Sequence, residues 1–305
     1  MANGNGVLGW TPKLWAAVVG LVAYGIVACF LSFRWWKSVK PRRWTLVLVI
    51  GAWTMTLGFL IRIIWGIGDN VDSIPVYAIQ NLFLLLSPCA YLAFSYMVLP
   101  RLATYLDAED CLFLRSRWIV RIFVTADVVT FLTQASGGGM AASGGDMAKT
   151  GDKLTLGGLI LQVISFGLFT FLTVWFGYRS RSRHMVWTSR NPSAGQRFFN
   201  RWTTLYYVLL LTCVAYLTRC IFRVAEFVNG YDSYLATHEG YFYLLDALPL
   251  VIAISLFFFV WPPSIFAHDA NALDGGSREY GTATATGSPS YDPENKGTDV
   301  EMRHV

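Results

Sequence analysis

The chain of 305 residues is 54% hydrophobic and 16% aromatic, and only 14% of its residues are charged. A soluble domain carries about a quarter charged residues, so this composition excludes an ordinary soluble protein and indicates an integral membrane protein. The formal net charge is +5, but the basic residues are spread over several short segments. Because they form no single patch, nucleic-acid binding is a poor explanation.

Seven apolar stretches are long enough to cross a membrane, since a spanning helix needs about 20 mostly apolar residues. They cover residues 14–33, 44–65, 79–99, 118–134, 156–176, 203–224 and 241–260. The fourth is the shortest, and the glycines at 137–139 and at 144 and 145 predict that it ends there in a mobile outer loop. Pro88 and Pro249 are expected to kink or loosen the third and seventh helices. The sequence therefore predicts an all-α membrane protein with a seven-transmembrane helix bundle over residues 14–266.

The distribution of basic residues predicts the orientation of this bundle. Lysine and arginine gather after the first, third and fifth stretches, which places those loops in the cytoplasm. Residues 1–13 are then an extracellular N-terminus. Residues 267–305 are rich in Gly, Ser, Thr, Asp and Glu, and such a segment buries too little apolar surface to fold. We expect it to be a disordered cytoplasmic tail.

Ionisable residues in the last two stretches are the most informative feature, because charges inside a membrane are costly and mark function. Arg219, Arg223 and Glu226 share one helix face by their spacing, and Glu239 and Asp246 share another. These two faces can turn a cationic and an anionic stripe toward each other. The other polar candidates inside the stretches are Arg62, Gln80, Asp127, Gln134 and Gln162. Two hypotheses stay open for the set, a polar cavity that binds a ligand and a network that only fixes helix register.

Several enzyme and cofactor classes lack the residues they need. No lysine lies within an apolar stretch, which excludes a retinal Schiff base. Of the four histidines, only His238 lies near the membrane outside the basic fifth loop and the tail, so zinc and haem ligand sets are missing. The Gly-x-Ser-x-Gly pattern of a hydrolase is absent. We predict a protein that is not an enzyme and has neither cofactor nor metal.

The polar residues and their surroundings resemble one family, the fungal seven-span lipid-translocating exporters, which include the sphingoid-base exporter and the aminocholesterol-resistance proteins. The resemblance is carried by residues 58–62 and 80–88, by Asp127, Gln134, Gly158 and Gln162, and above all by Arg219, Arg223, Glu226, Gly230, Glu239, Tyr243 and Asp246. It implies a fungal source and the export or flipping of amphipathic lipids, such as sphingoid long-chain bases, at the plasma membrane. It also implies a contribution to lipid-stress or toxic-compound resistance.

Our leading hypothesis is therefore a lipid exporter or flippase whose partners are membrane lipids. The carboxylates of Asp127, Glu226, Glu239 and Asp246 would meet a cationic amine or bound water, and Arg62, Arg219 and Arg223 would neutralise them at rest or meet an anionic headgroup. A seven-transmembrane receptor-like sensor is the main alternative. It is disfavoured because the seventh stretch lacks Asn-Pro-x-x-Tyr and the third ends without an acidic-Arg-aromatic triplet. A stress-response membrane protein without transport activity is the third hypothesis.

Overall fold

A computed structural model describes residues 14–38, 43–67, 74–142, 145–182, 202–229 and 239–266. The long helices are α1 (Leu14–Trp36), α2 (Leu46–Trp65), α3 (Ile74–Tyr105), α4 (Ser116–Ala142), α5 (Gly145–Ser182), α7 (Trp202–Asn229) and α10 (Leu248–Phe259). Seven helical segments are long and apolar enough to cross a membrane, and no strand occurs in the described ranges. The predicted all-α, seven-helix membrane fold is confirmed. The predicted N-terminal segment and the predicted tail, residues 1–13 and 267–305, lie entirely outside the described residues.

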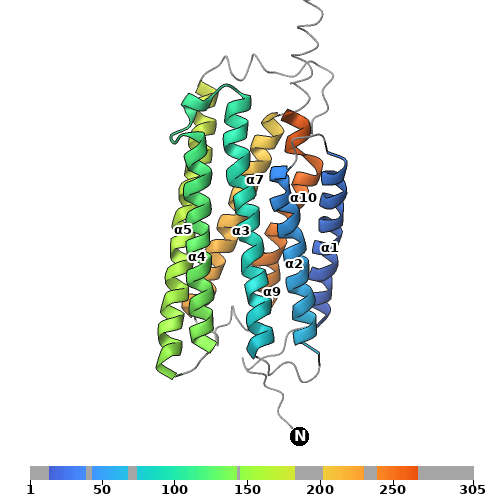
Figure 1. The fold of residues 1–305 in the computed structure, drawn as a ribbon, viewed down its shortest axis with the longest axis vertical. Helices are drawn as coiled ribbons and strands as arrows, with labels where there is room; N and C mark the ends of the chain where they lie inside the picture. The colour runs from blue at the N-terminus through green and yellow to red at the C-terminus, as the bar shows by residue number, and fades with distance from the viewer. Residues whose placement is uncertain are drawn as a thin grey trace, which may run out of the picture. The chain divides into compact units, whose positions relative to one another are not determined.

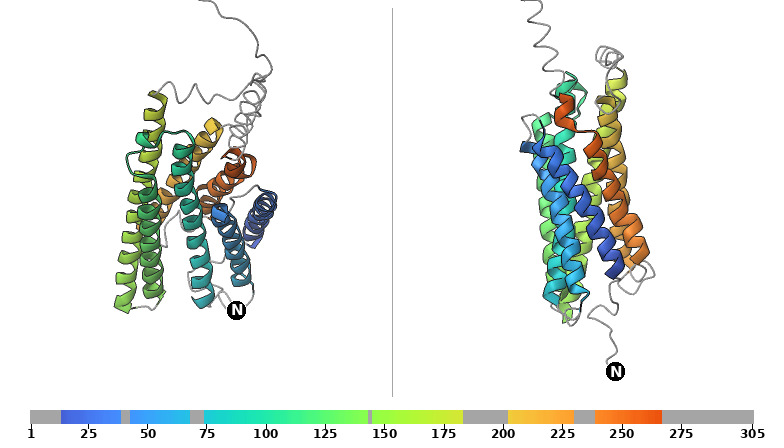
Figure 2. Two further views of the ribbon diagram at one scale, coloured as in Figure 1. Left: turned by 45° about the horizontal axis from the view of Figure 1, so that its top comes forward. Right: turned by 90° about the vertical axis from the view of Figure 1, so that its right-hand side faces the viewer.

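The helices pack largely in chain order. Helices α1 to α5 each contact the next one, α7 packs against α5, and α10 packs against both α7 and α1. Helix α3 also contacts α7 and lies in the middle of the bundle, with α4 and α5 on one side and α1 and α2 on the other (Figure 1, Figure 2). The chain thus returns so that its last two spans lie beside the central helix.

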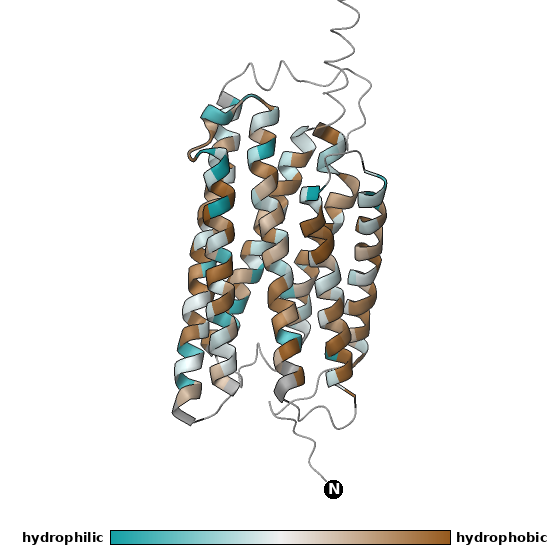
Figure 3. Ribbon diagram, in the orientation of Figure 1, coloured by the Kyte–Doolittle hydropathy of each residue, from teal (hydrophilic) through white to brown (hydrophobic). Residues whose placement is uncertain are grey.

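Apolar side chains cover the outer faces of the bundle, as a hydrocarbon solvent requires. Val19 on α1, Ile164 on α5 and Val214 on α7 are 59%, 61% and 57% exposed, whereas Arg219 is 4% and Asp246 0% exposed. Apolar residues predominate along the middle of the helices (Figure 3). Arg219 and Asp246 therefore lie inside the bundle, away from the apolar outer faces.

The prediction that the fourth helix ends at the glycine run is wrong. Helix α4 continues through the glycines at 137–139 to Ala142, and α5 begins at Gly145. A methyl group added at Gly151 would lie 2.5 Å from the backbone oxygen of Gly137. These glycines let the backbones of α4 and α5 approach closely, as small residues do between membrane helices. The apolar solvent, which cannot hydrogen-bond a freed backbone, also favours an unbroken helix.

The last span is irregular where it meets the centre of the bundle. A short helix α9 (Glu239–Tyr241) leads into the π-helical segment η5 (Phe242–Ala247), which joins α10 just before Pro249. The Tyr24 hydroxyl of α1 donates a hydrogen bond of 2.8 Å to the carbonyl of Ala247. The loosening predicted at Pro249 thus takes the form of a π-helical turn, whereas α3 runs as one helix through Pro88.

Candidate functional site: a buried ion-pair cluster

Four charged side chains of α7 and η5 form what we call the ion-pair cluster: Arg219, Arg223, Glu226 and Asp246. The Arg219 Nε lies 3.2 Å and the Arg223 Nε 3.0 Å from Asp246 Oδ1. Arg223 Nη2 also donates to Asp246 Oδ2 at 3.3 Å, and its Nη1 lies 3.2 Å from Glu226 Oε2. Of the predicted anionic stripe, Asp246 meets both arginines, whereas the side chain of Glu239 lies outside the described residues.

Exposure separates the two carboxylates of the ion-pair cluster. The side chain of Asp246 is 0% exposed and binds both guanidinium groups, whereas that of Glu226 is 24% exposed and, among the described residues, pairs with Arg223 alone. A buried charge pair is expensive to break because the partner left behind stays buried and uncompensated. Asp246 is therefore the anchor of the cluster, and Glu226 is its accessible acid.

Arg219 also compensates for a proline in the neighbouring helix. Pro88 has no backbone N–H, so the carbonyl of Leu84, four residues earlier, has no helical donor. Arg219 Nη2 lies 3.4 Å from that carbonyl oxygen and donates to it. The arginine thus joins α3 to α7 and supplies a hydrogen bond that a membrane interior would otherwise leave unmade.

An aromatic ring connects the ion-pair cluster with α2. The guanidinium carbons of Arg62 and Arg223 lie 5.1 Å and 5.2 Å from the centroid of the Phe242 ring, within the range of cation–π attraction. Arg62 is 6% exposed and Phe242 9%. The predicted residue Arg62 therefore lies beside the cluster and contacts the same ring as Arg223.

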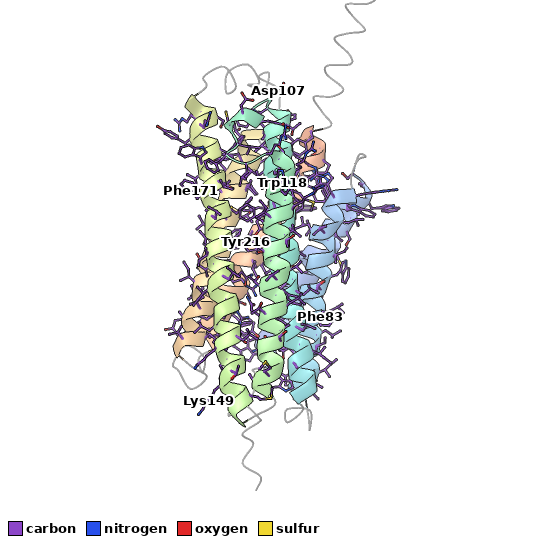
Figure 4. The ribbon with its side chains drawn as sticks, turned by 60° about the vertical axis from the view of Figure 1, so that its left-hand side comes forward. Phe83, Asp107, Trp118, Lys149, Phe171 and Tyr216 are labelled. Carbon is purple, nitrogen blue, oxygen red and sulfur yellow. The ribbon has the colours of Figure 1, made fainter. Side chains whose placement is uncertain are left out.

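A cavity of about 20 Å³ lies between α3, α5 and α7, next to the ion-pair cluster. Its polar lining consists of Gln162, Tyr216, Arg219, Cys220 and Arg223, and Pro88 forms part of the α3 wall. A volume of this size holds a water molecule or a group of similar size. Figure 4 shows Tyr216 about midway along the bundle, between Asp107 near one end and Lys149 near the other.

The remaining predicted site residues are not all brought together. Gln134 on α4 donates a hydrogen bond of 2.8 Å to Gln162 on α5, so these two form a pair beside the cavity. Asp127 is 2% exposed and makes no ion pair with any residue that the structure describes, although it shares a helix with Gln134. Gln80 is 2% exposed near the start of α3, and its Oε1 accepts no hydrogen bond. The side chain of Glu239 lies outside the described residues.

Sequence reasoning missed three contributors to this site: Tyr24, the carbonyl of Leu84, and Phe242. The freed carbonyl was detectable in principle, because a proline inside a span always removes one backbone donor. Tyr24 and Phe242 carry no such signal, since an aromatic residue in an apolar stretch is most often only packing. In the ranges that the structure covers, no group of three His, Cys, Asp or Glu side chains is placed to hold a metal ion.

Comparison with known proteins agrees with this architecture. The chain is 30% identical to Protein RTA1 of Saccharomyces cerevisiae, over 83% of this chain and 84% of that protein. It is 29% identical to the sphingoid long-chain base transporter RSB1 of the same yeast, over 83% of this chain and 72% of that protein. It is 31% identical to protoporphyrin uptake protein 1, also of that yeast, over 62% of this chain and 59% of that protein. No solved structure matches. The RTA1-like protein family model matches residues 48–269, which contain every residue of the ion-pair cluster, and the chain belongs to that family.

Proposed function

We propose that this protein moves amphipathic lipids, among them sphingoid long-chain bases, across the plasma membrane as an exporter or flippase. The observation that supports it is a buried ion-pair cluster in an apolar seven-helix bundle, beside a cavity lined by Gln162, Arg219 and Arg223. The names of two relatives refer to transport of a long-chain base and uptake of protoporphyrin. The N-terminus would lie outside and the C-terminus inside, as the basic loops predict.

The carboxylates of Glu226 and Asp246 would have different roles in binding the lipid. Glu226 holds one contact, to Arg223, and is the more exposed acid, so a cationic amine can take its place beside this carboxylate. Arg223, once released from Glu226, can meet an anionic headgroup while Asp246 keeps both arginines in position. The lipid tail would lie against the apolar helix faces. No catalytic residue or cofactor enters this scheme, so movement would follow a gradient or the mass action of the lipid.

The test is reconstitution of the purified chain in liposomes with a tail-labelled fluorescent long-chain base. Its movement between leaflets is followed by quenching from outside. The informative variant is Glu226→Gln, which keeps the size and hydrogen-bonding capacity of the side chain but removes its charge. Glu109→Gln is the matched control, because Glu109 is exposed and bonds Thr104 away from the ion-pair cluster.

We expect wild type and Glu109→Gln to move the base faster than protein-free liposomes, and Glu226→Gln to move it at least several-fold more slowly. No movement above protein-free liposomes in the wild type would overturn the proposed function. Equal rates in all three proteins would leave transport standing and remove Glu226 from the site.

A further inference from the structure

Asp127 on α4 is a buried acid that is not part of the ion-pair cluster. The residue is 2% exposed, and within the described ranges neither of its carboxylate oxygens has a well-aligned hydrogen bond or an ion pair. The Tyr96 hydroxyl of α3 interacts with this carboxylate, although the hydroxyl has no well-aligned hydrogen bond among the described residues. An acid so placed differs from Asp246, which binds two guanidinium groups.

Within the described ranges, the titratable groups that interact electrostatically with Asp127 are Tyr96 and Cys89 of α3 and Cys220 of α7, which are uncharged at neutral pH. Arg219 interacts with Cys89 and Cys220 as well, so it lies in the same region. The Arg219 guanidinium, however, binds Asp246 and the Leu84 carbonyl.

Aromatic rings complete the environment. Tyr96 packs against Phe123, one turn before Asp127 on α4, with ring centroids 5.3 Å apart, and against Phe169 of α5 at 4.6 Å. The ring of Tyr216 on α7 packs against that of Phe166 on α5, with centroids 5.7 Å apart, and so joins this group of rings. A carboxyl group beside several aromatic faces is a combination that suits an organic ammonium group, which both ionic and cation–π attraction stabilise.

A charged carboxylate in this setting is unfavourable, because desolvating it without a counter-ion is costly. Without a cation nearby, burial therefore favours the neutral acid over the carboxylate. The cavity is lined by residues of α3, α5 and α7, and one of them, Cys220, interacts electrostatically with the Asp127 carboxylate. An ammonium group is small enough for a space of about 20 Å³.

We propose that Asp127 is an exchange site at which a proton and the ammonium group of a cationic lipid compete. When the ammonium group binds, Asp127 becomes a carboxylate and one proton leaves to solvent; when the lipid leaves, the proton returns. The site gains one cation and loses one, so its net charge does not change. The proposal rests on the proposed function and adds an energy source, because a proton gradient would then drive the movement of cationic lipids.

The experiment measures protons released on binding, separately from transport. The full chain in detergent micelles is titrated with sphinganine at pH 7 in two buffers of different ionisation enthalpy, and the difference in heat gives the protons released per lipid. N-acetylated sphinganine, which carries no cation, serves as the control ligand. Asp107→Asn is the control variant, because Asp107 is exposed and its φ of 49° suits asparagine.

In the wild type and in Asp107→Asn we expect a measurable release of up to one proton per sphinganine and none per N-acetylated lipid. Affinity for sphinganine should rise about tenfold per pH unit while Asp127 is protonated, by proton linkage. Asp127→Asn should release no proton, lose this pH dependence, and melt within a few degrees of wild type, because an amide resembles a protonated acid. Asp127→Glu should retain the exchange.

Two outcomes overturn the proposal: no proton release in the wild type, or the same release in Asp127→Asn. The proposed function is judged apart from it. If liposomes show movement of the base but binding releases no proton, only the exchange site is wrong. If binding releases a proton but no movement occurs, the exchange site stands and the transport assignment fails.

Discussion

Replacing Asp246 should damage the fold more than any other single change in the ion-pair cluster. Its side chain is fully buried and receives contacts from Arg219 and Arg223 at 3.2 Å and 3.0 Å. Asp246→Ala leaves two guanidinium groups in the interior with no carboxylate between them, and removing one partner of a buried ion pair costs about 3–5 kcal/mol. Glu226→Ala removes one contact from a side chain that is 24% exposed, so its cost should stay below about 1 kcal/mol.

The comparison is made on purified full-length protein by thermal unfolding in detergent, with surface abundance in cells as a second measurement. The midpoint should fall at least twice as far for Asp246→Ala as for Glu226→Ala. A double variant with Arg219→Ala should be less unstable than the sum of the single variants, because it removes a buried charge that has lost its partner. Equal midpoints for the two single variants would show that Asp246 does not anchor the cluster, and the argument from burial would then be wrong.

Three further predictions test other parts of the structure. Gly151→Ala should lower the unfolding midpoint, since its new methyl group would lie 2.5 Å from the backbone oxygen of Gly137, whereas Gly138→Ala, with nothing within 4 Å, should be neutral or stabilising; equal effects would contradict the close approach of α4 and α5. Tyr24→Phe should cost about 1 kcal/mol in unfolding experiments by removing the hydrogen bond to Ala247, and an unchanged midpoint would show that this bond does not hold the π-helical segment. A tag at the N-terminus should be accessible on intact cells and one at the C-terminus only after permeabilisation, as the basic loops predict; accessibility of both on the same side would refute the orientation.

The number and type of the elements could be predicted from the sequence because each depends on local information. An apolar stretch of about 20 residues must form a helix in hydrocarbon, where every backbone group needs an internal partner. The spacing of Arg219, Arg223 and Glu226 likewise places them on one face of α7 whatever surrounds the helix. Both predictions hold in the structure, and the charged stripe faces Asp246 as expected.

The glycine run shows where local rules fail. Glycine ends helices in water because it has conformational freedom and exposes its backbone to solvent. Between α4 and α5 the same residue type is selected for its missing side chain, which allows the two backbones to touch at Gly137 and Gly151. The sequence alone does not say which of these two properties is used, because the answer depends on the neighbouring helix.

Which polar residues share a site was likewise decided only by tertiary packing. The sequence placed Asp127 among the acids that arginines would neutralise. In the structure both arginines of α7 pair with Asp246, and Asp127 pairs with no charged group of the described ranges. It also brings Gln134 to Gln162 and Arg219 to the carbonyl that Pro88 frees. Spacing along a chain determines the face of a helix on which a residue lies, whereas its partner depends on how helices far apart in sequence are rotated against each other, and that rotation is set by the packing of the whole bundle.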